Sequence, residues 1–225
     1  MDDKDDDKDM ALLAGYEALD STTISDALDA AGLPSGIGGM VPVWGHPKVV
    51  GFAATVELAP VTDQTAGTHI AASAVAAGGP GNVMVIANGG RTDVSCWGGL
   101  LSLGARLRGV RGVVADGACR DIRDARELAF PVYARGGVPA TARGRLRQVS
   151  AGEPVRIDSV TVARGDVVVA DESGVVFVPR ARARDVLLAA QALDQRERAI
   201  ADDLRAGVPL DAAMRDARLA GIEEH

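Results

Sequence analysis

Between residues 83 and 134 the sequence alternates short apolar runs with glycine-rich breaks and segments of helical character. The pattern predicts strands at 83–87, 112–115 and 131–134 and helices at 97–108 and 122–129. The first two runs contain no charged residue, which is typical of strands covered on both faces. This order implies βαβ crossovers and a parallel sheet. Ligands bind beyond the carboxyl ends of such strands, so the breaks at 88–90 and 116–117 are candidate site positions.

The flanking segments complete an α/β domain. We expect two short helices within 11–31, a buried strand at 49–58, a helix at 68–77, and short strands at 155–157, 160–162, 167–170 and 175–178 that form a small β-layer. The domain is assigned to residues 11–179. Residues 180–225 are expected to be a C-terminal helical extension that packs on the core or on a neighbouring subunit. Residues 1–10, MDDKDDDKDM, resemble an acidic tag and are expected to be disordered.

Charge and hydropathy exclude several function classes. The net charge is −7, and the tag-like stretch, with six Asp and two Lys, contributes −4, which leaves −3 for the rest. A mildly acidic body argues against a nucleic-acid partner. The sequence has neither an apolar run of about 18 residues nor a signal-type segment, so we expect no membrane span and a cytoplasmic location. Cys96 and Cys119 lack metal-type spacing and are expected to be free thiols.

Arg120 and Asp121 are the strongest candidates for chemistry, because they follow a predicted strand at the start of the next helix. The guanidinium can hold a carboxylate with two parallel hydrogen bonds, and the adjacent carboxylate can hold a hard cation such as Mg²⁺. The structural alternative is that Asp121 caps the helix and Arg120 forms a surface ion pair. Cys119 could have a lowered thiol pKa beside Arg120, but without a nearby His we expect a buried filler.

The Gly98-Gly99-Leu100-Leu101 segment opens the helix predicted at 97–108. Backbone N–H groups in the first turn of a helix have no intrahelical acceptor, so such a turn can bind an anion. The alternative is that the two glycines only permit close packing of the helix on the sheet.

Taken in order, several segments resemble the RraA-like family, which includes the class II 4-hydroxy-4-methyl-2-oxoglutarate aldolases. The likeness runs from about Thr23 to Pro179 and rests on Trp97–Leu101, Arg108–Asp121, Phe130–Gly136, Gly165–Asp166 and Asp171–Pro179. It implies an α/β/β sandwich, a swivelling β/β/α-type domain, with a C-terminal helical tail. It also implies a homotrimer or homohexamer with the active site between subunits.

The same resemblance assigns roles to the candidate residues. Arg120 and the backbone of Gly98, Gly99, Leu100 and Leu101 would bind a 2-oxo-acid substrate, and Asp121 would anchor a divalent metal, Mg²⁺ or Mn²⁺. The implied reaction is retro-aldol cleavage that releases pyruvate, or decarboxylation of oxaloacetate. Both reactions need an electron sink for a pyruvate-type enolate, which a Lewis-acid cation and an Arg can supply.

One departure from the family pattern leaves alternatives open. The aldolases of the family carry an acid at the position of Gly99, where it positions a metal-bound water for proton transfer. Loss of such a group typically costs on the order of 10²–10⁴ in rate. The leading interpretation is a metal-assisted lyase. The first alternative is a scaffold retuned for another enolate reaction, with a pocket enlarged at Gly99 for a bulkier substrate. The second is a non-enzymatic regulator that binds an endoribonuclease.

Overall fold

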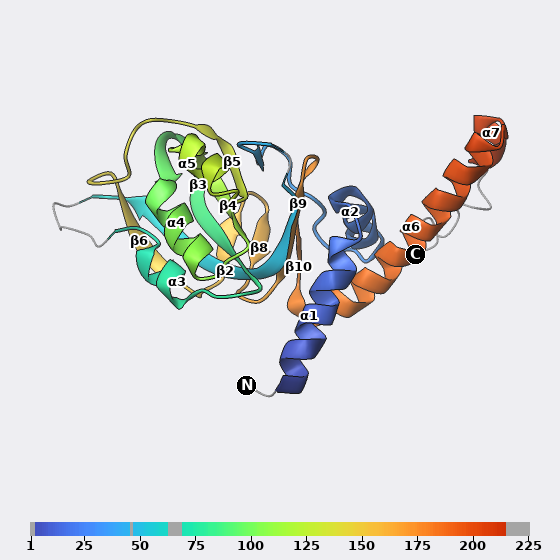
Figure 1. Ribbon diagram of the computed structural model, residues 1–225, viewed down its shortest axis with the longest axis horizontal. Coiled ribbons are helices and arrows are strands. Elements are labelled where there is room, and N and C mark those ends of the chain that lie inside the picture. Colours follow the sequence, from blue (N-terminus) through green and yellow to red (C-terminus); the bar gives the residue numbers. More distant parts are fainter. Residues whose placement is uncertain (1–2, 46, 63–68, 215–225) are drawn as a thin grey trace.

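The computed structural model describes residues 3–45, 47–62 and 69–214 (Figure 1). Its helices are α1 (Asp3–Glu17), α2 (Ser21–Ala30), α3 (Ala72–Ala77), α4 (Gly99–Leu107), α5 (Ile122–Glu127), α6 (Ala183–Arg205) and α7 (Leu210–Ala213), with the 3-10 turn η1 (Arg180–Arg182). The strands are β1 (Val41–Pro42), β2 (Val49–Pro60), β3 (Asn82–Trp97), β4 (Gly112–Cys119), β5 (Val132–Gly137), β6 (Leu146–Ala151), β7 (Val155–Ile157), β8 (Val160–Val162), β9 (Val167–Asp171) and β10 (Gly174–Val178).

An eight-stranded sheet forms the centre of the domain. Its order is β1-β5-β4-β3-β2-β9-β10, and β6 also pairs with β2. Strands β2, β3, β4 and β5 run parallel, which confirms the predicted parallel core. The predicted separate β-layer is only partly right. Strands β7 and β8 form a two-stranded hairpin, but β9 and β10 join the main sheet as antiparallel strands. Four of the five residues of β9 and all of β10 are buried, so these strands need cover on both faces.

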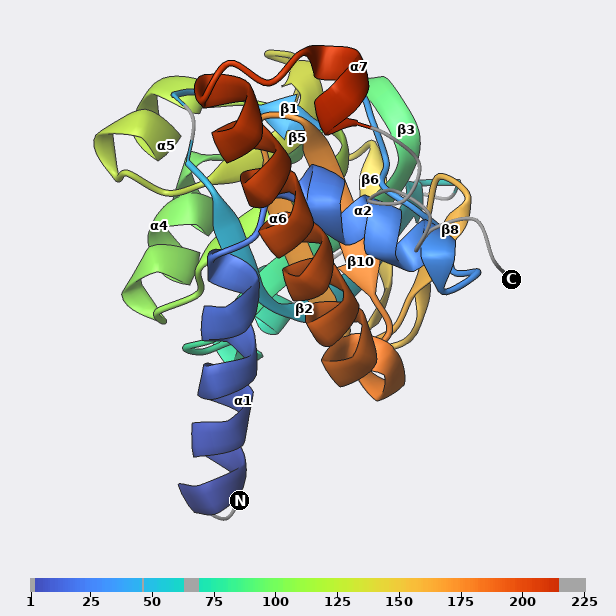
Figure 2. The same ribbon diagram turned by 90° about the vertical axis from the view of Figure 1, so that its right-hand side faces the viewer.

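Three apolar clusters define the layers. The first lies between one face of the sheet and helices α3, α4 and α5, and the second lies between the opposite face and the β7–β8 hairpin. This is an α/β/β sandwich, as expected. The third cluster packs α1, α2 and α6 against β2, β9 and β10, and Figure 2 looks onto these three helices. Helix α6 extends well beyond the sheet towards α7 (Figure 1).

The two predicted breaks lie inside strands. Strand β3 continues through Asn88, Gly89 and Gly90 to Trp97, and β4 continues through Asp116 and Gly117 to Cys119. Gly89 and Gly90 adopt φ values of 62° and 71°, which suit glycine, and the β3–β4 register shifts between Ala87 and Arg91. The prediction missed the continuation because glycines in a bulge look like glycines in a turn. The carboxyl ends of the strands therefore lie further along the chain, directly before Gly98 and Arg120.

The N-terminal prediction was wrong for the residues that the structure describes. Asp3–Met10 belongs to α1, where we expected a disordered segment. The helix extends towards the N-terminus from the apolar Ala11–Tyr16 stretch, and the carboxylate of Asp9 pairs with Arg180. The helix expected at 68–77 begins at Ala72, and residue 68 lies outside the described residues. Within the described ranges, no helix is both long enough and apolar enough to span a membrane.

Candidate active site

Two neighbouring strand–helix junctions form the candidate site. Strand β3 leads into α4 through Gly98, and β4 leads into α5 through Arg120 and Asp121. The ends of the two strands are in register, since Trp97 pairs with Cys119 and the Arg120 N–H donates to the Trp97 carbonyl at 3.0 Å. The fold therefore brings together the two motifs that the sequence singled out separately.

The Asp121 carboxylate faces the start of α4. Its Oδ2 accepts a hydrogen bond from the Gly99 N–H at 3.0 Å, and Arg120 Nε lies 3.3 Å from the same oxygen. Asp121 adopts φ 57° and ψ 40°, a left-handed conformation that Asp tolerates better than most residues. The aspartate thus caps α4 rather than its own helix α5, where it forms no side-chain cap bond.

Position 98 at this junction favours glycine for steric reasons. A Cβ on Gly98 would lie 2.9 Å from Asp121 Oδ2 and 3.2 Å from Arg120 Cγ. Its φ of −159° is open to any residue, so the constraint is steric. The absent side chain lets both charged groups approach the turn. The charged pair therefore points towards the glycine-rich helix start, as the proposed chemistry requires.

Leu100 and Leu101 differ in environment. The Leu101 side chain is buried in the cluster beneath α4, whereas Leu100 is 79% exposed. Leu100 shares its face of the helix with Leu103 and Leu107, which are also exposed. Leu100 and Leu101 can offer an anion their backbone N–H groups, because both lie in the first turn of α4. The Gly99 N–H is already engaged by Asp121.

Buried contacts of Trp97 hold the turn at Gly98 in place. The rings of Trp97 and Phe130 stack with centroids 6.4 Å apart. Trp97 Nε1 donates to Ser102 Oγ at 2.9 Å, and Ser102 Oγ donates to the Gly98 carbonyl at 3.3 Å. Because all of these groups are buried or partly buried, the Gly98 carbonyl is tied to the core.

Asp124, which the sequence reasoning did not single out, lies beside Gly99 at the candidate site. A Cβ on Gly99 would lie 2.2 Å from Asp124 Oδ2 and 3.0 Å from its Cγ. The expectation of a pocket enlarged at Gly99 is therefore wrong, because the Asp124 carboxylate occupies that space. The spacing of three residues between Asp121 and Asp124 gives no clear signal, because Asp121 has a left-handed backbone and precedes α5, so the side-chain neighbours of a regular helix are not expected here.

The carboxylates at this turn are the type of ligand that a hard cation binds. Asp121 and Asp124 offer carboxylate oxygens beside a turn without side chains. Among the described residues, no group of three or more His, Cys, Asp or Glu is placed to enclose a metal. Mg²⁺ suits two carboxylates, because it binds through few protein ligands and keeps several waters. Neighbouring Cys119 is a free thiol buried in the core, as expected, and burial raises its pKa to about 11.

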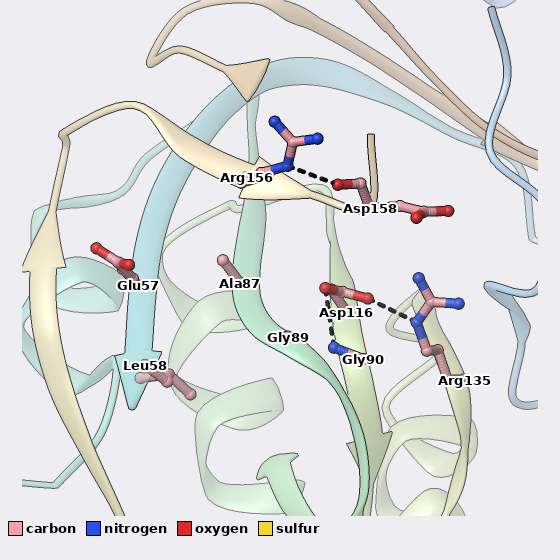
Figure 3. Close-up of a pocket in the computed structure, with 9 residues that line it drawn as sticks. All are labelled: Glu57, Leu58, Ala87, Gly89, Gly90, Asp116, Arg135, Arg156 and Asp158. Atoms are coloured by element: carbon pink, nitrogen blue, oxygen red, sulfur yellow. Dashed lines mark hydrogen bonds and ion pairs between the residues drawn. The ribbon is translucent and has the colours of Figure 1, made fainter. Parts of the chain in front are cut away.

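A separate cavity of about 420 Å³ lies on the hairpin side of the sheet (Figure 3). Asp116 and Arg135 line it from the sheet, and Arg156 and Asp158 line it from the hairpin. Arg135 Nε lies 2.6 Å from Asp116 Oδ1, and the Gly90 N–H donates to Asp116 Oδ2 at 3.1 Å. None of the residues predicted for catalysis lines this cavity.

The class of protein follows from an α/β/β sandwich in which a glycine-rich strand–helix junction lies beside a charged one. The chain belongs to the RraA-like family, whose Aldolase/RraA model matches residues 21–177. DlpA of Legionella pneumophila is 31% identical over 205 residues, which cover 91% of this chain but only 33% of DlpA. A Halalkalibacterium halodurans protein, provisionally named 4-hydroxy-4-methyl-2-oxoglutarate aldolase, is 33% identical over 87% of this chain and 91% of its own length.

Two solved structures resemble the whole domain. An uncharacterized protein from Pseudomonas syringae superimposes with a TM-score of 0.84 at 34% identity and covers 91% of this chain and 92% of its own. RraAS2 from Streptomyces coelicolor, described as an unusual member of the RNase ES inhibitor RraA protein family, gives a TM-score of 0.76 at 28% identity. It covers 84% of this chain and 94% of its own.

Proposed function

We propose that the chain is a divalent-metal-dependent carbon–carbon lyase that cleaves or decarboxylates a 2-oxo acid through a pyruvate-type enolate. The observation that carries this proposal is the convergence of the Arg120 guanidinium and the Asp121 carboxylate on the Gly98–Gly99 turn. Relatives named for 4-hydroxy-4-methyl-2-oxoglutarate aldolase activity support the choice of reaction.

Arg120 would bind the keto and carboxylate oxygens of the substrate. Its side chain is 38% exposed, so it can reach a ligand from solvent while Nε stays near Asp121. A guanidinium aimed at the keto oxygen stabilises the negative charge that develops there as the carbon–carbon bond breaks. The N–H groups of Leu100 and Leu101 would hold the remaining carboxylate oxygen at the helix start.

Asp121 would hold the divalent cation. When bound, Mg²⁺ or Mn²⁺ would supply Lewis-acid polarisation of the substrate carbonyl. In the structure Asp121 also caps α4, so one carboxylate orients the substrate-binding turn and offers an oxygen to the cation. Substitution by Asn separates these roles, because an amide oxygen still accepts the Gly99 N–H but carries no charge.

We further propose that a second copy of the chain covers the site in a homotrimer or homohexamer. Leu100, Leu103 and Leu107 form an exposed apolar stripe along α4 that begins one residue after Gly99, whose N–H binds Asp121. Exposed apolar stripes of this kind mark interaction surfaces, and cover there would exclude water from the enolate.

The test is pyruvate release from oxaloacetate and from 4-hydroxy-4-methyl-2-oxoglutarate, with Mg²⁺ or Mn²⁺ and then with EDTA. We expect turnover that EDTA abolishes, and a loss on the order of 10²-fold or more in Asp121→Asn and Arg120→Lys. Arg123→Lys is the matched control, because Arg123 is 84% exposed on the same helix and pairs only with Glu127 among the described residues. Metal-independent turnover, or full activity in Asp121→Asn, would refute the proposal.

A second candidate function is regulation of an endoribonuclease, which the likeness to RraAS2 favours. It predicts no pyruvate release and inhibition of RNase ES by the purified chain. Inhibition that survives Arg120→Lys and Asp121→Asn, without turnover of either compound, would establish this candidate over the lyase.

A further inference from the structure

A row of side chains crosses the parallel sheet beneath the β7–β8 hairpin. Glu57 of β2 pairs with Ala87 of β3, and Ala87 pairs with Asp116 of β4. Arg135 of β5 completes the row beside Asp116. All four residues line the cavity of about 420 Å³ on the hairpin side, a volume in the range of small-molecule sites. Ala87 belongs to the apolar cluster under the hairpin, so the row marks the place where this cluster gives way to charged groups.

Asp116 holds Arg135 in a position to bind an anion. The buried Asp116 carboxylate accepts hydrogen bonds from Arg135 Nε at 2.6 Å and from the Gly90 N–H at 3.1 Å. Among the described residues, the two terminal nitrogens of Arg135 have no partner, and Figure 3 shows them on the side of the guanidinium that faces Asp158. A guanidinium edge that is fixed in this way can bind a carboxylate with two parallel hydrogen bonds.

The remaining charges of the cavity favour a cationic ligand. Asp158 and Glu57 are exposed, and neither carboxylate has a hydrogen-bond or ion-pair partner within the described part of the chain. The lining residues comprise three acids, Glu57, Asp116 and Asp158, and two arginines, Arg135 and Arg156, so the net charge is −1. A ligand with a net charge of +1 complements this lining.

The layout of the row separates the charges of that ligand. Glu57 lies on β2, and the Arg135 guanidinium lies against Asp116 on β4, two strands away. Neighbouring strands are about 4.8 Å apart, so the two ends are about 10 Å apart across the sheet. Figure 3 shows Glu57 and Arg135 at opposite ends of the cavity, with Ala87 between them. A carboxylate at one end and a cation at the other therefore need an aliphatic stem between them.

We propose that this cavity is a binding site for a basic α-amino acid. The α-carboxylate would bind the free edge of Arg135, and the α-ammonium would bind the Asp158 carboxylate. The stem would cross Ala87 and place the side-chain cation at Glu57. The proposal does not depend on the proposed lyase function, because the cavity shares no residue with the candidate active site and a 2-oxo acid carries no ammonium group.

Isothermal titration calorimetry on the full chain tests the ligand class with lysine and three analogues that each lack one charged group. 6-Aminohexanoate lacks the α-ammonium, cadaverine lacks the carboxylate, and norleucine lacks the side-chain ammonium. We expect lysine to bind with a Kd below about 1 mM and each analogue to bind at least about 10-fold more weakly. No heat of binding with lysine up to about 10 mM, or equal affinity for lysine and norleucine, would overturn the proposal.

Two variants test the acids of the cavity. Glu57→Gln should reduce the preference for lysine over norleucine, and Asp158→Asn should reduce the preference for lysine over 6-aminohexanoate, each at least about 10-fold. Asn suits position 158, because this residue has a φ of 53° and Asn tolerates the left-handed region. Glu153→Gln is the matched control, since Glu153 is an exposed acid beside the hairpin that does not line the cavity. Unchanged preferences in both variants, or an equal loss of lysine affinity in Glu153→Gln, would contradict the assignment.

A third variant tests the carboxylate anchor. Arg135→Lys keeps a positive charge beside Asp116 but loses the planar edge, so it should reduce the preference for lysine over cadaverine. Thermal melts verify that each variant is folded. Pyruvate release should be the same in Glu57→Gln, Asp158→Asn and the unmodified chain. Failure of lysine binding therefore refutes this site alone, and absence of pyruvate release in the unmodified chain refutes only the lyase.

Discussion

Replacement of Arg135 by Met should destabilise the fold by about 3 kcal/mol. The Arg135 guanidinium pairs with Asp116 at 2.6 Å, and the Asp116 side chain is only 3% exposed (Figure 3). Removal of one partner from a buried ion pair typically costs about 3–5 kcal/mol, because the other charge stays buried without compensation. Arg135 is itself 23% exposed, so water can reach part of the vacated space, and we take the lower end of that range. The Gly90 N–H remains as a partner of the carboxylate.

A double variant isolates the buried charge as the cause. Asp116→Asn combined with Arg135→Met removes the charge and keeps an acceptor for the Gly90 N–H, so it should recover about 1–2 kcal/mol relative to Arg135→Met alone. The assay is urea unfolding followed by fluorescence of the buried Trp97, at one fixed protein concentration because association shifts apparent stability.

Arg123→Met is the control for this series, since the same substitution at an 84% exposed residue should cost less than about 0.5 kcal/mol. A loss below about 1 kcal/mol in Arg135→Met, or a double variant no more stable than the single one, would refute the reasoning.

Three further outcomes follow from the site. Gly98→Ala should leave the fold intact but lower pyruvate release at least about 10-fold. The added methyl group would lie only 2.9 Å from Asp121 Oδ2 and would push this carboxylate out of place. An unchanged kcat would contradict this prediction. Ser102→Ala should cost about 1–3 kcal/mol in urea unfolding by leaving the buried Trp97 Nε1 without its partner, whereas Ser102→Thr should cost less. Burial raises the pKa of Cys119 from 9.0 to about 11, so the unfolded chain loses that proton first as the pH rises. The free energy of unfolding should therefore fall between about pH 9 and 11, by up to about 1.4 kcal/mol per pH unit for this thiol. Cys119→Ala should flatten the decline, and an unchanged slope would refute this assignment.

The parallel core could be predicted from local patterns alone. The apolar runs at 83–87 and 112–115 are too short for helices, carry no charge, and are each followed by a helical segment. Their neighbours along the chain are also their neighbours in the sheet, as is usual for βαβ units. Local sequence patterns also predicted that Gly98 and Arg120 lie at strand–helix junctions. Adjacent parallel strands bring such junctions together.

What escaped prediction depended on contacts between distant residues. The glycines of 88–90 look the same in a turn and in a bulge, and only pairing with β4 shows that β3 continues. Strands β9 and β10 look like a separate layer until the antiparallel pairing of β2 with β9 joins them to the main sheet.

The sequence by itself determined the parallel βαβ core and the arginine–aspartate pair, because hydrophobic periodicity and chain adjacency are local properties. The tertiary structure decided which groups meet across the two junctions. Asp121 caps the preceding helix, and Asp124 fills the space that Gly99 leaves open. Both contacts join α5 to α4 across more than 20 residues of chain, and their geometry depends on how β3 and β4 bring the two helices side by side.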